Sequence, residues 1–466
     1  MIKKLFLASV ILSQLTISCS NNNEDEAVIA PPTAAEESLK EQIANILKQP
    51  YSKLLPAEQK VKLEIEANEM LLQMDKSKSS GAIEAIQNLK NLLTISPIDV
   101  FGGKNGNEVE DILKVADVYG IYTWNNTDKI WKRTSSTTDL KFVFPAKTNG
   151  TENNATFSAK SVSSDIKVKF TDTYGSWSYP QTGQPVYTPG VDDYFFLPTS
   201  ADATLTIGGA QAATFVSGAK YSKGVNTPDE ASYKMVLNDG YAFEVSGNKK
   251  ATDNTGKATF SYNGKNLVEF NAGSTSDIDG LLSEEPLAQY RGKANGLVKI
   301  MDNFIIVADM DLTAEANDAK ALEKSAIYPD QLNYKDPKSD YKAFYTAINT
   351  YEKKYSEGTA ANFNKNMKLI LVSKKDGTKI ADIVMRSEKQ GDDYIFNLPV
   401  WDNEYEYWTT WDEKGELFSQ PYLEEVYYLK FSDNTQIAMS AYFSDGFEKL
   451  QTKFEDFLKT FTDRNN

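Results

Sequence analysis

Tight-turn sequences between short apolar stretches recur along most of this chain from about residue 119 onwards. The strongest is Asn263-Gly264, which lies between Ala258–Tyr262 and Leu267–Phe270. Both turn residues readily take the positive φ angle that a two-residue hairpin needs. Similar turn sequences stand at Asn238-Asp239-Gly240 and Asp376-Gly377. Strands joined by such turns pair antiparallel, so the pattern predicts a largely antiparallel sheet.

Helical spacing replaces this pattern in the N-terminal part of the chain. Leu39, Ile43, Ile46 and Leu47 recur at helical intervals, and two further stretches with the same spacing follow. Prolines and glycines separate the three stretches, as expected at helix ends. The spacing therefore predicts three antiparallel helices in a helical region over 36–118.

The rest of the chain, 119–466, is predicted to be β-rich, with helices at 313–325, 340–356 and 446–462. The last helix is amphipathic, with a stripe of phenylalanines and leucines on one side. The predicted fold class is α+β: an N-terminal helical bundle, then a large, curved, mainly antiparallel sheet and a C-terminal amphipathic helix. The pattern leaves open whether 119–466 is one domain or two.

Histidine is absent from the 466 residues, and Cys19 is the single cysteine. Catalytic triads and Cys-His nucleophiles need a histidine base, so the sequence excludes them. The usual zinc sites need His or Cys ligands, and a disulfide within the chain needs a second cysteine. We therefore expect no metal site, no cofactor and a fold that is held together by its core.

The formal net charge is −15, with 65 acidic and 50 basic residues. Nucleic-acid binding depends on clustered basic side chains that neutralise phosphates, and the chain has no such block. Nucleic acid is therefore not an expected partner. The charge also argues against broad electrostatic contact with anionic lipid headgroups.

Residues 1–18 have the order of a secretory signal peptide. Two lysines precede the apolar stretch Leu5–Leu12, and the small residue Ser18 stands before Cys19. The apolar stretch is too short to cross a bilayer as a helix. The acidic, proline-containing stretch that follows shows no periodicity, which predicts a flexible tether over 19–35.

Residues 1–26 resemble the beginning of a Bacteroidota outer-membrane lipoprotein. The cysteine stands at the expected cleavage point, and Glu24, Asp25 and Glu26 resemble the export signal of surface-exposed lipoproteins. The resemblance implies that Cys19 is lipidated and becomes the mature N-terminus. It also implies that the protein is attached to the cell outer membrane through N-terminal acyl chains, with its orientation left open.

The densest aromatic cluster is Trp401–Trp411, which holds three of the six tryptophans. Strand alternation predicts that Glu404, Glu406 and Trp408 share one face. The opposite face would hold Tyr405, Tyr407 and Trp411, with Tyr407 and Trp411 pointing inward. Trp401 begins the cluster.

Three interpretations of this cluster stay open. Aromatic planes beside carboxylates suit a glycan platform, which makes Trp401, Glu404, Glu406 and Trp408 candidate ligand-binding residues. Paired carboxylates also serve as acid and base in glycoside hydrolysis, but sequence spacing does not give their separation. The third interpretation is an aromatic strand that packs on the C-terminal helix.

Trp177 is a further candidate, because it lies in Tyr174–Pro180, which is rich in aromatic and turn residues. Exposed loop aromatics can form the edge of a binding site, whereas a buried Trp177 would pin the loop to the sheet.

These features favour a lipid-anchored, non-catalytic binding or structural protein, with a glycan or protein partner. No catalytic residue is assigned. An apolar-ligand carrier with a half-barrel sheet and a carboxylate-dependent, glycan-active enzyme are the alternatives. A hydrophobic cavity would favour the carrier, and two acids facing each other across a cleft would favour the enzyme.

Overall fold

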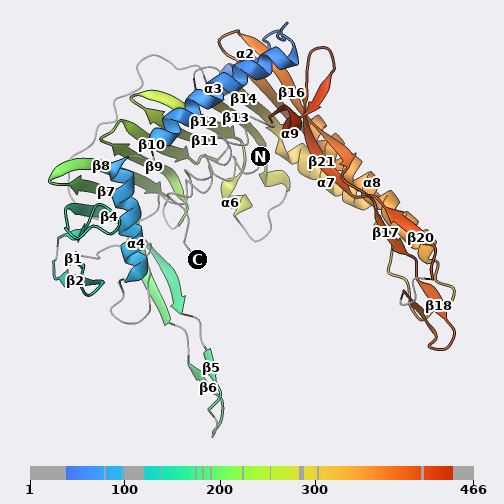
Figure 1. Ribbon diagram of the computed structural model, residues 1–466, viewed down its shortest axis with the longest axis horizontal. Coiled ribbons are helices and arrows are strands. Elements are labelled where there is room, and N and C mark those ends of the chain that lie inside the picture. Colours follow the sequence, from blue (N-terminus) through green and yellow to red (C-terminus); the bar gives the residue numbers. More distant parts are fainter. Residues whose placement is uncertain are drawn as a thin grey trace.

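One large sheet organises the molecule. The computed structural model describes residues 38–77, 80–96, 98, 120–136, 138–173, 176–180, 183–188, 191–222, 225–251, 253–282, 288–301, 304–410 and 414–443. Sixteen strands of this part of the chain form a continuous sheet, which bends into an arch in Figure 1. The prediction of an α+β fold with a large, mainly antiparallel sheet is confirmed.

The strands of this sheet are β1 (Gly120–Asn125), β2 (Ile130–Thr134), β3 (Leu140–Phe144), β4 (Ala155–Thr173), β7 (Val191–Ile207), β8 (Ala210–Tyr221), β9 (Pro228–Leu237), β10 (Tyr241–Asn248), β11 (Asn254–Tyr262), β12 (Lys265–Ser274), β13 (Lys293–Ile300), β14 (Phe304–Asp311), β15 (Met367–Ser373), β16 (Thr378–Lys389), β21 (Leu423–Lys430) and β22 (Gln436–Ala438). From β3 to β22 they lie side by side in chain order, apart from the short strands inserted before β7 and β21. Among the described pairs of neighbouring strands in this sheet, only β1 and β3 run parallel, and all other pairs are antiparallel.

The hairpin between β11 and β12 confirms the turn signal at Asn263-Gly264. Asn263 has φ 48° and Gly264 φ 75°, so both residues are in the left-handed region. Consecutive positive φ angles match the twist of a two-residue hairpin, and asparagine and glycine adopt them most readily.

The helices are α2 (Leu39–Leu47), α3 (Pro56–Ser77), α4 (Gly81–Ile95), α6 (Ile278–Leu281), α7 (Leu312–Ser325), α8 (Tyr341–Asn366) and α9 (Met439–Tyr442), with the 3-10 turn η1 (Ala288–Tyr290). Polar side chains fix several of their N-termini. Ser38 and Glu41 form a capping box at α2, and Asp340 accepts from the amide of Ala343 at 2.9 Å. No described helix has the length and apolar character needed to cross a membrane.

The two faces of the sheet differ in chemistry. Phe215, Met235, Phe243, Phe260 and Val268 lie opposite one another on β8 to β12 and belong to what we call the apolar face. Side chains alternate along a strand, so the next residue of each strand points the other way. The other side, the polar face, holds Val216, Lys234, Glu244, Thr259 and Glu269.

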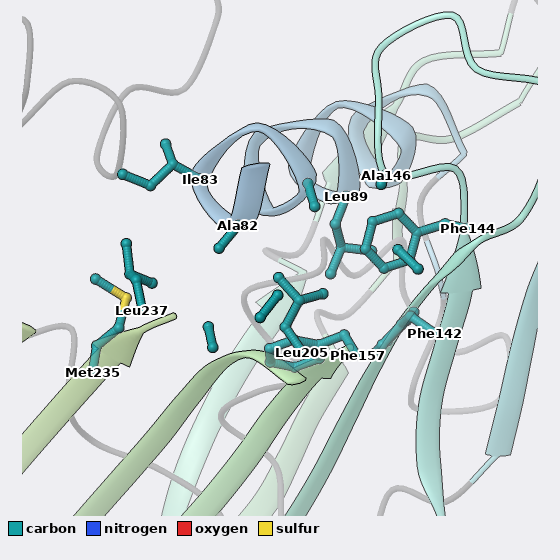
Figure 2. Packing of buried hydrophobic residues seen from close by; sticks show 14 of the residues in the cluster. Ala82, Ile83, Leu89, Phe142, Phe144, Ala146, Phe157, Leu205, Met235 and Leu237 are labelled. Atoms are coloured by element: carbon teal, nitrogen blue, oxygen red, sulfur yellow. The ribbon is translucent and has the colours of Figure 1, made fainter. Parts of the chain in front are cut away.

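The apolar face carries the main cores. Over β1 to β12 the buried residues of α4, among them Leu89, gather with Phe142, Phe144 and Leu205. Figure 2 shows these side chains between the helix and the strands. Over β14 to β21 a second core takes Leu63 from α3 and Tyr442 from α9. Burial of this apolar surface is the main stabilising contribution to the fold.

The polar face is covered differently: α2 packs on it and forms a small core of its own there. Ile43 of α2 is 2% exposed and contacts the cluster formed by Leu297, Ile305 and Val307. Beyond α2 the chain runs beside β16, where the hydroxyl of Tyr51 donates to the Asp382 carboxylate at 2.6 Å. It then enters α3 on the opposite face.

The predicted N-terminal helical bundle is not confirmed. The three helices occur within the predicted region, but α2 contacts β12 to β14 and α4 contacts β8. Because α2 and α3 lie on opposite faces of the sheet, the sheet stands between them. The predicted helix at 446–462 lies outside the described residues.

Helix α8 is longer than the predicted 340–356, because it continues through Gly358. A Cβ atom at Gly358 would lie 2.4 Å from Cδ1 of Leu322 on α7. Gly358 therefore allows α7 and α8 to pack closely, and the helix continues to Asn366.

Candidate functional site

Two short-stranded extensions leave the sheet at opposite ends of the arch and point to the same side (Figure 1). The ribbon arm is the hairpin of β5 (Ser176–Ser178) and β6 (Val186–Thr188). The C-terminal arm, residues 327–355 and 394–422, contains the first half of α8 and two hairpins. Its strands are β17 (Tyr394–Asn397), β18 (Val400–Asp402), β19 (Tyr407–Thr409) and β20 (Leu417–Gln420).

Helix α8 supports the C-terminal arm through an aromatic contact. The ring of Tyr345 lies 4.8 Å from Phe396 of β17 and 5.9 Å from Phe418 of β20. Burial in this cluster raises the pKa of Tyr345. Lys342 reinforces the contact by donating to both carboxylate oxygens of Glu416, at 2.6 and 2.9 Å. These contacts hold the β17–β20 hairpin against a helix that is itself anchored on the sheet.

Trp401 and Trp408 form a cross-strand pair on the β18–β19 hairpin, with ring centroids 6.1 Å apart. The Nε1 of Trp408 donates to the carbonyl of Asp336 at 2.8 Å, and its ring lies 5.1 Å from Tyr341. Both tryptophans are half-buried. The expectation that Trp408 points outward is wrong, because this side chain fastens the hairpin to the segment before α8.

Residues 403–406 form a turn where the sequence predicted a continuous strand. Oδ1 of Asp402 accepts from the amides of Glu404 at 2.8 Å and Tyr405 at 3.1 Å. Glu406 has φ 55°, which breaks the extended backbone. Alternation therefore does not apply across 402–407: Glu404, Tyr405 and Glu406 are all exposed, and Tyr407 is half-buried. Trp411 lies outside the described residues.

Exposed tyrosines gather on the C-terminal arm. The exposed fraction is between 51% and 67% for all of Tyr328, Tyr334, Tyr394, Tyr405 and Tyr422. Large aromatic side chains that are left in solvent on a supported element mark contact surfaces. Sequence reasoning named none of these as a candidate. It placed Tyr405 on the strand face opposite Glu404, Glu406 and Trp408, and the others are isolated tyrosines whose neighbours come from other segments.

A cleft of about 730 Å³ lies beside α8, next to the end of α7. Hydroxyl and charged side chains line much of it, including Asp340, Thr346, Thr350 and Lys354. Tyr351 also lines it, and Tyr328 stands at its edge with the two rings 5.1 Å apart and nearly perpendicular. The cleft thus combines aromatic faces with hydrogen-bonding groups, which is the usual composition of a small-molecule site.

The ribbon arm places Trp177 in solvent. Trp177 is 59% exposed and packs on its cross-strand neighbour Tyr187, with centroids 5.1 Å apart. Tyr179 beside it is 76% exposed. The interpretation of Trp177 as a pin that holds a loop to the sheet is therefore wrong. Trp177 and the residues of 401–408 belong to different arms and do not form one site.

No group of three or more acidic residues that could hold a metal ion occurs within the described part of the chain. Asp309 and Asp311, two acids at the end of β14, have structural partners: Asp309 accepts from Asn295 at 2.9 Å, and Asp311 caps α7. Cys19 lies outside the described residues.

Comparisons of the chain with protein-family models, with curated proteins and with solved structures find no match. The functional interpretation therefore rests on the sequence and the geometry of the arms.

Proposed function

We propose that this protein is a lipid-anchored, non-catalytic binding protein of the cell envelope and that its C-terminal arm contacts a glycan. The observation that carries the proposal is the set of exposed tyrosines on a helix-supported arm, among them Tyr328, Tyr394 and Tyr405. Sugar rings present apolar C–H faces that pack on aromatic planes, and their hydroxyls hydrogen-bond to polar side chains. The C-terminal arm supplies both, in the tyrosines and in the adjacent cleft.

The position of the two glutamates supports binding over catalysis. Glu404 and Glu406 lie on one open turn, where they can accept hydrogen bonds from hydroxyl groups. Hydrolysis of a glycosidic bond needs two carboxyl groups on either side of the scissile bond, within about 5–10 Å of each other. The mixed lining of the cleft, with hydroxyl and charged groups beside apolar ones, is compatible with a sugar, which has both hydroxyls and apolar C–H faces.

A glycan array followed by calorimetric titration tests the arm. Tyr328→Ala and Tyr405→Ala should each weaken the best array ligand at least tenfold, because each removes an exposed ring. The free energy of unfolding should fall by no more than about 1.5 kcal/mol, since each substitution removes one aromatic contact, with Tyr351 or Tyr407.

Ile65→Ala is the matched control, since Ile65 is 63% exposed on α3 and lies away from both arms. Wild-type affinity in both tyrosine variants would refute the proposal. Release of a sugar product that Glu404→Gln or Glu406→Gln abolishes would replace it with the enzyme alternative.

Membrane attachment is tested separately at Cys19. The Cys19→Ala variant should not be labelled by a radioactive fatty acid. It should also either leave the membrane fraction or keep its signal peptide uncleaved. Continued lipid labelling of this variant would show that the anchor lies elsewhere.

A further inference from the structure

A second recess lies on the polar face and shares no lining residue with the cleft of the C-terminal arm. It has a volume of about 1360 Å³, and α2 forms one wall. Its floor crosses β8 to β13, where Gly218, Ser232 and Ser246 lie opposite one another on successive strands. Because these side chains are small, they leave space above the strands. Neighbouring strands are spaced about 4.8 Å apart, so the six strands from β8 to β13 give a floor about 24 Å wide. The recess is therefore an elongated groove.

The groove is positively charged although the chain as a whole is acidic. Four lysines and two glutamates line it: Lys220, Lys257, Lys299 and Lys374, with Glu230 and Glu269. Each glutamate pairs with a lysine, at 2.7 Å for Lys220–Glu230 and 2.9 Å for Lys299–Glu269. The exposed lysines Lys257 and Lys374 have no ion-pair partner within the described residues. The lining thus carries two excess positive charges in a protein of net charge −15.

Glu269 organises the middle of the floor. Its Oε1 accepts from Lys299 at 2.9 Å and from the Asn271 amide at 2.6 Å, and its Oε2 accepts from Asn266 at 2.9 Å. Burial alone would raise the pKa of Glu269, but these donors hold it below its usual value. The carboxylate therefore stays ionised and fixes one lysine and two amides in place along the groove.

We propose that this groove binds an anionic polysaccharide, a chain of sugars that carry carboxylate groups. The excess lysines supply the charge complementarity, and the amide and hydroxyl side chains between them match a hydroxyl-rich backbone. No aromatic residue lines the groove among the described residues, which disfavours neutral sugars that depend on stacking. Every strand of the floor is paired on both sides, so the floor offers no free edge to an extended peptide.

Calorimetric titration with an oligogalacturonate tests the proposal. The double variant Lys257→Glu/Lys374→Glu should weaken binding at least tenfold, and wild-type affinity should fall steeply between low salt and 0.5 M salt. Lys147→Glu/Lys320→Glu makes the same charge change at exposed positions outside the groove and should bind as wild type does. Ser246→Trp should weaken binding without a change of charge, because it fills the floor.

Three outcomes would overturn the proposal: unchanged affinity in both groove variants, equal affinity for a neutral oligosaccharide of the same length, or tighter binding of a polyglutamate peptide. Tyr405→Ala should leave oligogalacturonate binding intact. This variant separates the groove from the C-terminal arm, so that either site can fail without the other.

Discussion

Phe243 and Glu244 are neighbours on β10, yet they belong to two different environments. Phe243 is 8% exposed on the apolar face, with its ring 4.5 Å from Phe260. Glu244 is exposed on the polar face and pairs with Lys234 at 2.5 Å. The same strands thus build a packed core on one side and a solvated surface of charge pairs on the other. Helical cover makes the difference, since α3 and α4 pack over one side of the β8–β12 strands, whereas α2 contacts the other side only from β12 to β14.

The largest difference should appear between substitutions at these two neighbouring residues. Phe243→Ala removes a buried ring and leaves a cavity, which should cost about 3–5 kcal/mol of the free energy of unfolding. Glu244→Ala breaks only an exposed ion pair and should cost less than about 1 kcal/mol. Denaturant unfolding of both variants measures the difference. Similar costs for the two would mean that the faces are not separated as described.

An intermediate effect is expected at α2, where the polar face acquires its own core. Ile43→Ala should cost about 2–4 kcal/mol, because Ile43 is almost fully buried between the helix and the strands. Hydrogen exchange should show the loss concentrated in α2. Loss of protection spread evenly over the β8–β12 strands would contradict a separate small core. Ala44→Gly, on the exposed side of α2, is the control for the intrinsic stability of the helix.

A smaller effect than at α2 is expected at Glu269, and it should depend on pH. A carboxylate with a lowered pKa stabilises the folded state above its unfolded pKa, near 4.5, and this contribution is lost as the pH falls through the folded pKa. At pH 7, Glu269→Gln should cost about 1–3 kcal/mol, as expected for hydrogen bonds to a charged group. The difference from wild type should shrink below pH 4. A difference that stays constant with pH would show that the amide contacts, and not the charge, stabilise this site.

The sequence predicted the parts of the fold that depend on local chemistry. Hairpin turns such as Asn263-Gly264 and helix starts such as Asp340 carry their signal within a few residues. Predictions that depended on distant neighbours were wrong or incomplete. The end of α8 was placed too early: the helix continues through Gly358, where the absence of a side chain lets α7 pack closely.

The candidate sites show the same limit. The tryptophans at 177, 401 and 408 were identified by residue type, but their exposure depends on partners such as Tyr187 and Asp336. The groove could not be predicted at all. Gly218, Ser232 and Ser246 become one floor only through the pairing of three strands, and no single strand shows a pattern that indicates it.

The side-by-side order of the strands has a consequence for how the chain acquires its structure. From β7 to β12 each strand pairs with the next one through a short connection, so this part of the sheet can grow by successive hairpin additions with little loop-closure entropy. The contact between Tyr51 and Asp382 is different, because it joins residues 331 positions apart. Contacts of such large sequence separation form slowly. We therefore expect α2, and with it the wall of the groove, to dock last, after the strands that it covers have assembled.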